Sequence, residues 1–320
     1  MKILLICSGN SGQPNIAVLR QAESLQKAGL EIDFFLIKGR GLKGYIKNIK
    51  PLRITMKQNN YDILHAHYSF SAFTASIAGA KNLNVSLMGS DVNSGICNVM
   101  LIRIFRILFG WDSVIVKSRN METRLKIKSL KVIPNGVDTD IFKPMNLKDC
   151  QKRLGWDIKK NHILFPSDPN RPEKDYRLAL EGIRQVNDHD IEIHILNNVP
   201  QNEVPFYINA SDTLILTSRW EGSPNVIKEA MACNCPVVST KAGDVEWLFG
   251  CETGYYIVES KPPDVGEKLK MALAFRKNNI FTQGRQRIFS LQLDSESVVE
   301  KLFRLYTKAS LKKIGNEAVN

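Results

Sequence analysis

Two glutamates near the start of a predicted helix are the residues of this sequence best placed to do chemistry. Glu221 and Glu229 are separated by seven residues in the stretch EGSPNVIKE. Residues 214–217 predict a buried strand and residues 226–232 a helix, so Glu221 falls in the turn between them. Open α/β sheets bind ligands beyond the carboxyl ends of their strands, where a helix N-terminus offers N–H groups to a phosphate. The segment therefore suits a phosphorylated sugar, whose hydroxyls donate to carboxylates. The alternative is a pair of solvated charges.

Two cations follow an earlier predicted strand. Arg171 and Lys174 lie in the stretch RPEK, shortly after the apolar residues 163–166. Fixed cations stabilise the negative charge that gathers on a departing diphosphate. The pair therefore suits the same class of ligand as the glutamates, and the alternative is a solvated turn.

Short apolar strands that alternate with helices must position these side chains. The predicted strands are 3–7, 32–37, 63–66, 85–88 and 114–116, followed by a second series at 163–166, 191–196, 214–217, 237–239 and 255–258. Such alternation is typical of parallel sheets with right-handed crossovers. We therefore predict an α/β protein with a Rossmann-like domain at 1–145, a second at 146–300, and a C-terminal helix at 301–320 that can dock back on the first domain.

The composition is that of a globular protein with unevenly distributed charge. The net charge is +12, and the first 150 residues hold 21 Lys and Arg against 10 Asp and Glu. Such a basic surface attracts polyanions. The sequence contains no run of 18 apolar residues, which a membrane-spanning helix would require. Its six cysteines are not spaced as zinc ligands are. We expect a cytoplasmic protein with reduced thiols.

Six stretches of the chain are similar, in this order, to the landmarks of a known family. They are DILHAHY (62–68), GSD (89–91), PNGVDTDIFKP (134–144), RPEK (171–174), EGSPNVIKE (221–229) and GDVEWL (243–248). Together they resemble the retaining glycosyltransferases of family 4. The resemblance implies a GT-B architecture, in which two Rossmann-like domains face each other across a cleft. The acceptor would bind mostly to the first domain and the nucleotide-sugar donor mostly to the second.

The resemblance also implies roles for the residues of the second domain. Glu221 would contact the transferred sugar, and Glu229 the ribose hydroxyls of the nucleotide. Arg171 and Lys174 would contact the diphosphate. The loop between the glutamates would complete the donor site, through Gly222, Ser223, Asn225 and Val226.

Three further candidates come from the first domain. We expect His65 and His67, two residues apart at a strand end, to point to opposite sides, with His65 in the core. By resemblance, His67 lies near the donor sugar as a catalytic residue. Asp91 is a candidate hydrogen-bond acceptor for a sugar hydroxyl on the acceptor side, or a structural cap. Gly12 lies in the loop CSGNSGQPN, which is not a dinucleotide fingerprint but by family analogy covers the donor phosphates or the acceptor.

We expect no metal and no cofactor beyond the nucleoside-diphosphate sugar, which is a substrate. Asp-x-Asp pairs that bind a divalent ion mark another glycosyltransferase fold. Such pairs occur here at 138–140, in the interdomain connection, and at 188–190, in a polar turn before a strand. We expect neither pair to bind metal.

Two basic stretches also contain large apolar side chains. Residues 38–53 interleave Lys and Arg with apolar residues, and residues 100–111 carry Arg103 and Arg106 in MLIRIFRILFGW. Amphipathic segments that insert partly into lipid have this character. We expect the protein to contact the anionic inner face of the cytoplasmic membrane. The alternative is a buried core helix with solvated lysines, and no RNA-binding signature points to nucleic acid.

The expected function is sugar transfer without a metal ion. A retaining glycosyltransferase would move a hexose or related sugar from a nucleoside diphosphate to a saccharide or lipid-linked saccharide, as in bacterial capsule or lipopolysaccharide synthesis. One alternative is a related sugar-nucleotide epimerase. Another is a noncatalytic protein that binds anionic polymer or membrane.

Overall fold

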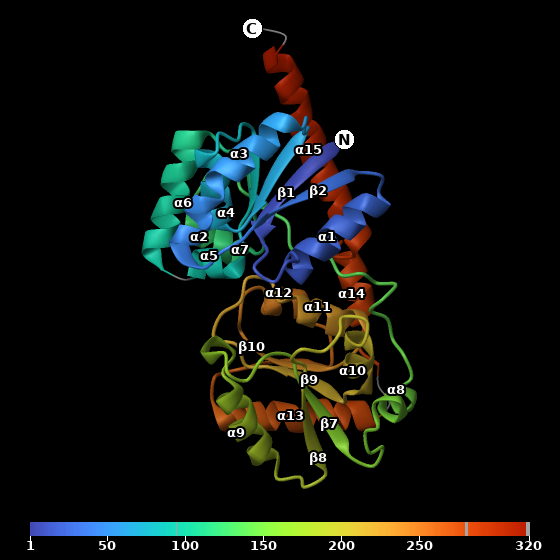
Figure 1. The fold of residues 1–320 in the computed structure, drawn as a ribbon. Helices are drawn as coiled ribbons and strands as arrows, with labels where there is room; N and C mark the ends of the chain where they lie inside the picture. Colours follow the sequence, from blue (N-terminus) through green and yellow to red (C-terminus); the bar gives the residue numbers. More distant parts are fainter. Residues whose placement is uncertain (94, 279–280, 318–320) are drawn as a thin grey trace. The chain divides into compact units, whose positions relative to one another are not determined.

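The computed structural model describes residues 1–93, 95–278 and 281–317. These residues fold into two α/β units, each built on its own parallel sheet (Figure 1). Residues 1–136 and the chain from Ser295 onward form the first unit, and residues 137–294 form the second.

The sheet of the first unit runs in the order β2-β1-β3-β4-β5-β6, with all neighbours parallel. Its strands are β1 (Lys2–Ser8), β2 (Glu31–Ile37), β3 (Ile63–His67), β4 (Leu83–Ser86), β5 (Ser113–Val116) and β6 (Lys131–Val132). Strand β1 is apolar and buried on both faces over residues 3–7, because helices cover both faces of the sheet. The chain order reverses between β1 and β3, which makes the carboxyl ends of these strands the natural ligand position.

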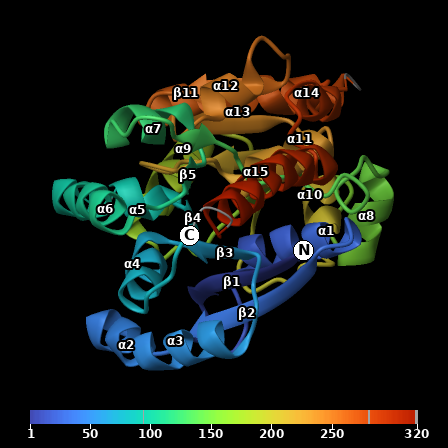
Figure 2. The same ribbon diagram turned by 90° about the horizontal axis from the view of Figure 1, so that it is seen from above.

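Two groups of helices cover this sheet. On one face α1 (Ile16–Lys27) and α15 (Ser295–Glu317) lie side by side (Figure 2), and Tyr306 of α15 belongs to one apolar cluster with Leu5 of β1. On the other face α3 (Ile49–Gln58), α4 (Ser69–Ile77) and α6 (Ile96–Phe109) contribute to the second cluster. The shorter helices of the unit are α2 (Gly41–Lys47), α5 (Gly89–Asn93) and α7 (Arg119–Leu125).

The sheet of the second unit is also parallel, in the order β11-β10-β9-β7-β8. Its strands are β7 (Asn161–Phe165), β8 (Ile191–Ile195), β9 (Thr213–Leu216), β10 (Val237–Thr240) and β11 (Tyr255–Val258). Here the chain order reverses between β7 and β9. The carboxyl ends of β7 and β9 are therefore the natural ligand position of this sheet.

Helices also cover both faces of the second sheet (Figure 1). The helices α9 (Tyr176–Val186) and α13 (Pro262–Lys277) pack on one face. The opposite face carries α10 (Val204–Ala210), α11 (Asn225–Ala232), α12 (Val245–Phe249) and α14 (Gly284–Ser290), with α8 (Leu147–Leu154) packed beside α10. A short 3-10 turn, η1 (Pro172–Lys174), follows β7.

The boundaries between the units differ from the predicted ones at residues 145 and 300. The first unit ends at Gly136, because Phe142 is already buried in the core of the second unit. The last helix begins at Ser295 rather than 301, and Val298 and Val299 are buried in the core of the first unit. A segment that connects the two units is assigned to the unit whose core buries its apolar side chains.

Candidate functional site

Lys174 and Glu221 meet where the loops after β7 and β9 come together. Lys174 ends η1, and Glu221 lies in the turn between β9 and α11. The Lys174 ammonium donates a hydrogen bond to Glu221 Oε1 and forms an ion pair with it. Both side chains are largely shielded, at 13% and 15% exposed. Ser218 Oγ donates to the same carboxylate oxygen over 2.8 Å, which fixes its position.

Three further hydrogen bonds to backbone carbonyls join the two loops. Thr217 Oγ1 donates to the carbonyl oxygens of Lys174 and Asp175 over 2.9 and 3.0 Å. The Arg219 N–H donates to the Glu173 carbonyl over 2.9 Å. These contacts hold the end of β9 against the turn that carries Lys174. The ion pair is therefore part of a fixed frame rather than a pairing of two mobile side chains.

Arg171 has a different environment from Lys174. Its guanidinium donates to Glu173 Oε1 over 2.8 and 2.5 Å, and its side chain is 53% exposed. The pKa of Glu173 is lowered, most strongly by a hydrogen bond from its own backbone and to a smaller extent by the Arg171 guanidinium. The structure thus brings Lys174 to Glu221 but leaves Arg171 engaged with its own turn.

The loop that carries Gly243 packs closely against the turn after Glu221, because residue 243 has no side chain. It adopts a φ of +67°, and a Cβ there would lie 2.6 Å from the Gly222 carbonyl oxygen and 3.1 Å from Glu221 Cβ. Only glycine tolerates both the positive φ and this approach. The GDVEWL stretch therefore supports the loop between the two glutamates from behind. The sequence marked this stretch only as one of six family landmarks and did not predict the close approach.

A buried lysine, missed by the sequence analysis, stands behind the same loop. Lys228 of α11 is completely buried, and its Nζ donates to Ser223 Oγ over 3.2 Å. Burial lowers the pKa of Lys228 to about 8, opposed by the nearby carboxylates of Asp244 and Glu229. Burial likewise raises the pKa of Asp244 to about 6, opposed by Lys228. The sequence gave no signal for this, because a lysine among good helix formers is usually solvated.

The start of α11 presents the remaining donor-site candidates. Asn225 and Val226 are its first two residues, and Pro224 at the N-cap has no side-chain oxygen that could accept from the helix amides. The first N–H groups of a helix have no partner within the helix and attract anions. Glu229 lies one turn further and is nearly buried, at 8% exposed. It is not a solvated helix charge.

His65 and His67 point to the same side of β3, and the prediction of opposite sides is wrong. Their rings stack with centroids 4.4 Å apart, because residues two apart on a strand share a face. His65 bonds Tyr306 Oη at 2.6 Å and Ser86 Oγ at 2.9 Å. His67 is also buried, and among the described residues neither of its ring nitrogens has a hydrogen-bond partner. Burial lowers the pKa of both rings, that of His65 to about 3.

Asp91 makes the contacts of a cap. Its two carboxylate oxygens accept from the backbone N–H groups of Ser69 and Met88, over 2.8 and 2.5 Å. Burial outweighs these hydrogen bonds and raises the pKa of Asp91 to about 6. Gly12 lies exposed in the loop after β1, with a φ of +84° and a hydrogen bond from its N–H to the Gly9 carbonyl. The donor or acceptor roles of these two residues stay predictions.

The two Asp-x-Asp strings are built into turns. Asp138 Oδ1 accepts from the N–H groups of Asp140 and Ile141 over 3.0 and 3.1 Å. Asp188 accepts from the Asp190 N–H over 2.9 Å and from Asn161 Nδ2 over 3.0 Å. In each string the first carboxylate thus stabilises local backbone.

The helix α6 carries an exposed apolar surface, so the alternative of a buried core helix is wrong. Its buried residues are Val99 and Ile102. The exposed ones are Ile96, Met100, Leu101, Ile104, Ile107, Leu108 and Phe109. Within the described part of the chain, no helix combines the length and apolar character that crossing a membrane requires.

Two family matches account for most of the chain. Residues 6–141 match the family described as Glycosyltransferase Family 4, and residues 162–274 match Glycosyl transferases group 1. The first match includes His67 and Asp91, and the second includes Lys174 and Glu221.

Two similar proteins are both named as sugar transferases. TuaC of Bacillus subtilis (strain 168), assigned as a teichuronic acid biosynthesis glycosyltransferase, is 26% identical over 66% of this chain and 63% of its own length. The UDP-Gal:alpha-D-GlcNAc-diphosphoundecaprenol alpha-1,3-galactosyltransferase of Escherichia coli is 21% identical over 67% of this chain and 66% of its own. The matched part of the chain thus spans just under two thirds of each relative.

A solved structure shares the fold. Sucrose-phosphate synthase from Thermosynechococcus elongatus superposes with a TM-score of 0.84 at 16% identity, over 96% of this chain and 98% of that one. The predicted α/β fold with two Rossmann-like units is confirmed.

Proposed function

We propose that this chain, which belongs to the family 4-like glycosyltransferases of the GT-B fold, is an active sugar transferase. In the proposed reaction it transfers a sugar from a nucleoside-diphosphate sugar to a hydroxyl of a saccharide or lipid-linked saccharide. The single observation that carries the proposal is the shielded pair of Lys174 and Glu221 at the reversal point between β7 and β9. Ligands of open α/β sheets bind at such a point. A cation and a carboxylate held together there match a diphosphate and the sugar attached to it.

The residues of the second unit take complementary roles in this reaction. Lys174 and the first N–H groups of α11 stabilise the charge that develops on the departing diphosphate. Glu221 accepts from hydroxyls of the transferred sugar, and Glu229 from those of the ribose. Arg171 would have to leave Glu173 to reach the diphosphate, so it contributes only after rotation of an exposed side chain.

The stereochemical outcome that we propose is retention. The acceptor hydroxyl attacks on the face from which the diphosphate leaves, so its oxygen bonds to the anomeric carbon as the bond to the phosphate oxygen breaks. The leaving phosphate oxygen takes the hydroxyl proton. This route needs no side-chain nucleophile and no metal ion.

One of the two relatives supports a uridine nucleotide and a lipid-linked acceptor. One is named for UDP-galactose and a diphosphoundecaprenol-linked sugar, and the other for teichuronic acid biosynthesis. We therefore place the reaction in the synthesis of a bacterial cell-surface polysaccharide on a membrane-bound carrier. Such an acceptor requires the enzyme to work at a membrane surface.

The exposed side of α6 supports this peripheral location. The apolar side chains of Ile107 and Leu108 are 76% and 71% exposed. By contrast, Arg103 and Arg106 of the same helix are partly buried and donate hydrogen bonds to backbone carbonyls. The helix is thus fixed by its arginines while its apolar side chains face outward. The basic helix α2 exposes Leu42 and Ile46 in the same unit. Apolar insertion combined with basic charge favours anionic lipid.

A vesicle flotation assay tests the membrane proposal. Wild-type protein should float with phosphatidylglycerol vesicles, and Ile107→Glu/Leu108→Glu should bind them at least about 10-fold more weakly, because burying each charge in lipid is costly. Ile158→Glu, an exposed apolar position in the second unit, is the matched control and should bind as wild type. Equal flotation of all three proteins would contradict the proposal.

A thermal-shift panel with UDP, GDP and ADP tests the donor class. Because a ligand that binds the native state stabilises it, UDP should raise the Tm. A noncatalytic polymer-binding protein would show no response to any nucleotide. An epimerase would change the donor sugar without acceptor, so incubation with donor alone followed by product analysis separates that alternative.

A further inference from the structure

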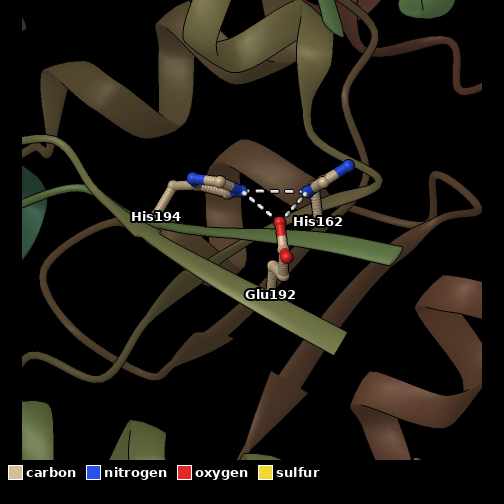
Figure 3. A group of neighbouring side chains, drawn as sticks. All are labelled: His162, Glu192 and His194. Carbon is tan, nitrogen blue, oxygen red and sulfur yellow. Dashed lines mark hydrogen bonds and ion pairs between the residues drawn. The ribbon is translucent and has the colours of Figure 1, made fainter. Parts of the chain in front are cut away.

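Two histidines and a glutamate cluster on one face of the second sheet, between β7 and its edge neighbour β8 (Figure 3). In the strand register, His162 pairs with Glu192, and His194 follows Glu192 by two residues on the same face. His162 is completely buried, whereas the side chains of His194 and Glu192 are 19% and 35% exposed. The reaction proposed above uses none of the three.

The three side chains direct their ligand atoms toward one point. His162 Nδ1 lies 2.9 Å from His194 Nε2 and 3.7 Å from Glu192 Oε2, and His194 Nε2 lies 4.0 Å from that same oxygen. Two atoms bound to a tetrahedral zinc ion at 2.0–2.1 Å lie about 3.3 Å apart. Each distance therefore differs from that of a zinc site by less than about 1 Å, which small side-chain rotations supply.

Neighbouring groups orient the cluster as they do around bound metals. His162 Nε2 bonds the Asp157 carbonyl over 2.9 Å, and because a carbonyl only accepts, this nitrogen carries the proton. The neutral ring then keeps its lone pair on Nδ1, the atom that faces the cluster. Metal-binding histidines are typically oriented by such a hydrogen bond from their other nitrogen.

The other two members are held as well. The ring of His194 stacks on Trp156, with centroids 3.4 Å apart and an angle of 8° between the planes. Lys160 donates to Glu192 Oε1 over 2.5 Å, which leaves the coordination point to Oε2. The Lys160 side chain is 37% exposed, so its ammonium can turn into solvent when a cation binds.

We propose that His162, Glu192 and His194 bind one zinc ion, with water as the fourth ligand. Two imidazoles and a carboxylate favour zinc and similar transition metals over magnesium and calcium, which prefer all-oxygen sites. Binding requires His194 to carry its proton on Nδ1 instead of Nε2. The ion then cross-links the edge strand β8 to β7, which stabilises the native state.

This site is separate from the proposed donor site. His162 is the second residue of β7, near the amino end of the strand, whereas Lys174 follows the carboxyl end. The side chains of the cluster lie on the face that α10 covers, since Leu164, two residues after His162, belongs to the apolar cluster of that face. Zinc binding and sugar transfer can therefore be tested independently.

Titration of untagged, chelator-treated full chain with ZnCl2 by calorimetry tests the proposal. We expect about one zinc per chain and a higher Tm, because the ion binds the native state. His194→Gln and Glu192→Gln should each weaken binding at least about 100-fold, since loss of even an outer partner costs 10–100-fold. Both residues are partly exposed, so these variants avoid the buried His162.

His189→Gln is the matched control, because it removes an exposed histidine three residues before Glu192. It should bind zinc as wild type does. Cobalt substitution adds a second readout: a four-coordinate site gives visible d–d absorption that His194→Gln abolishes. Absence of stoichiometric zinc binding, or equal binding by His194→Gln and His189→Gln, would show that the cluster is only a hydrogen-bonded histidine pair.

Discussion

The ammonium group of Lys174 and the carboxylate of Glu221 form an ion pair that connects the loops after β7 and β9. The two strands are neighbours in the sheet although the residues are far apart in sequence. The fold thus places together a cation for a phosphate and a carboxylate for a sugar hydroxyl. The catalytic proposal depends on this pairing.

Removing either member of the pair should reduce transfer. Lys174→Ala is expected to lower kcat by about 10²–10³-fold, because a fixed group that stabilises developing charge is worth that much. Glu221→Gln keeps the shape of the side chain and should mainly raise KM for the donor. Steady-state assays with UDP-sugar measure both, and circular dichroism checks the fold. If both variants transfer sugar at the wild-type rate, the pair has no part in the reaction.

Gly243→Ala should displace the loop between the two glutamates. The new methyl group would lie 2.6 Å from the Gly222 carbonyl oxygen, in addition to the strain of a positive φ, which costs about 1–2 kcal/mol. We expect a raised donor KM and a lower free energy of unfolding.

Gly155→Ala is the control for that change. Gly155 has a φ of +70°, and a Cβ there meets no atom within 4 Å. It should lose stability through backbone strain alone and keep the wild-type KM. An unchanged KM in Gly243→Ala would mean that the approach of the two loops does not shape the donor site.

The buried pair of Lys228 and Asp244 should oppose stability. Burial dominates both pKa shifts and moves each group toward its neutral form. Replacing such a pair with uncharged residues is often stabilising by about 1–4 kcal/mol. Lys228→Met/Asp244→Asn should therefore unfold at higher denaturant concentration, while its donor KM rises because Ser223 loses its partner. A double variant less stable than wild type would show that the pair is a net source of stability.

Asp91 should make stability depend on pH. Its pKa is raised from 3.8 unfolded to about 6 in the native state, so the native state binds more protons between these values. Stability therefore falls as pH rises from about 4 to 6, by up to about 3 kcal/mol. Denaturation of wild type and Asp91→Asn across pH 4–7 should show a steeper fall in wild type, because Asp244, whose pKa burial also raises to about 6, contributes the same slope to both proteins. Parallel curves for the two proteins would rule out Asp91 as its source.

The fold could be predicted from the sequence because its strands are short, apolar and regularly separated by helices. Residues 255–258 form β11 as predicted, and the helix predicted at 226–232 begins one residue earlier, at Asn225. The unit boundaries could not be placed as well. A position such as Phe142 is assigned by the core that buries it, which local pattern does not encode.

The candidate site was predictable only in part. The spacing of the glutamates and the RPEK stretch identified Glu221 and Lys174, which the structure brings together at one reversal point, whereas Arg171 pairs with Glu173 instead. The burial of Lys228 was not predictable, since it depends on which segments of the fold pack against α11, and local sequence does not encode that packing. The cluster of His162 and His194 was also missed, because it arises from the register of two strands and not from a spacing in sequence.

The most direct test of the central claim is the Kd of UDP for the full chain, measured by calorimetry on wild type, Lys174→Ala and Lys270→Ala. Lys270 is an exposed lysine of α13 and controls for a general loss of charge. We predict that UDP binds wild type and Lys270→Ala alike and Lys174→Ala at least about 10-fold more weakly, since a hydrogen bond to a charged group contributes about 1.5–3 kcal/mol. Equal affinity for Lys174→Ala and Lys270→Ala would contradict a diphosphate site at the junction of β7 and β9.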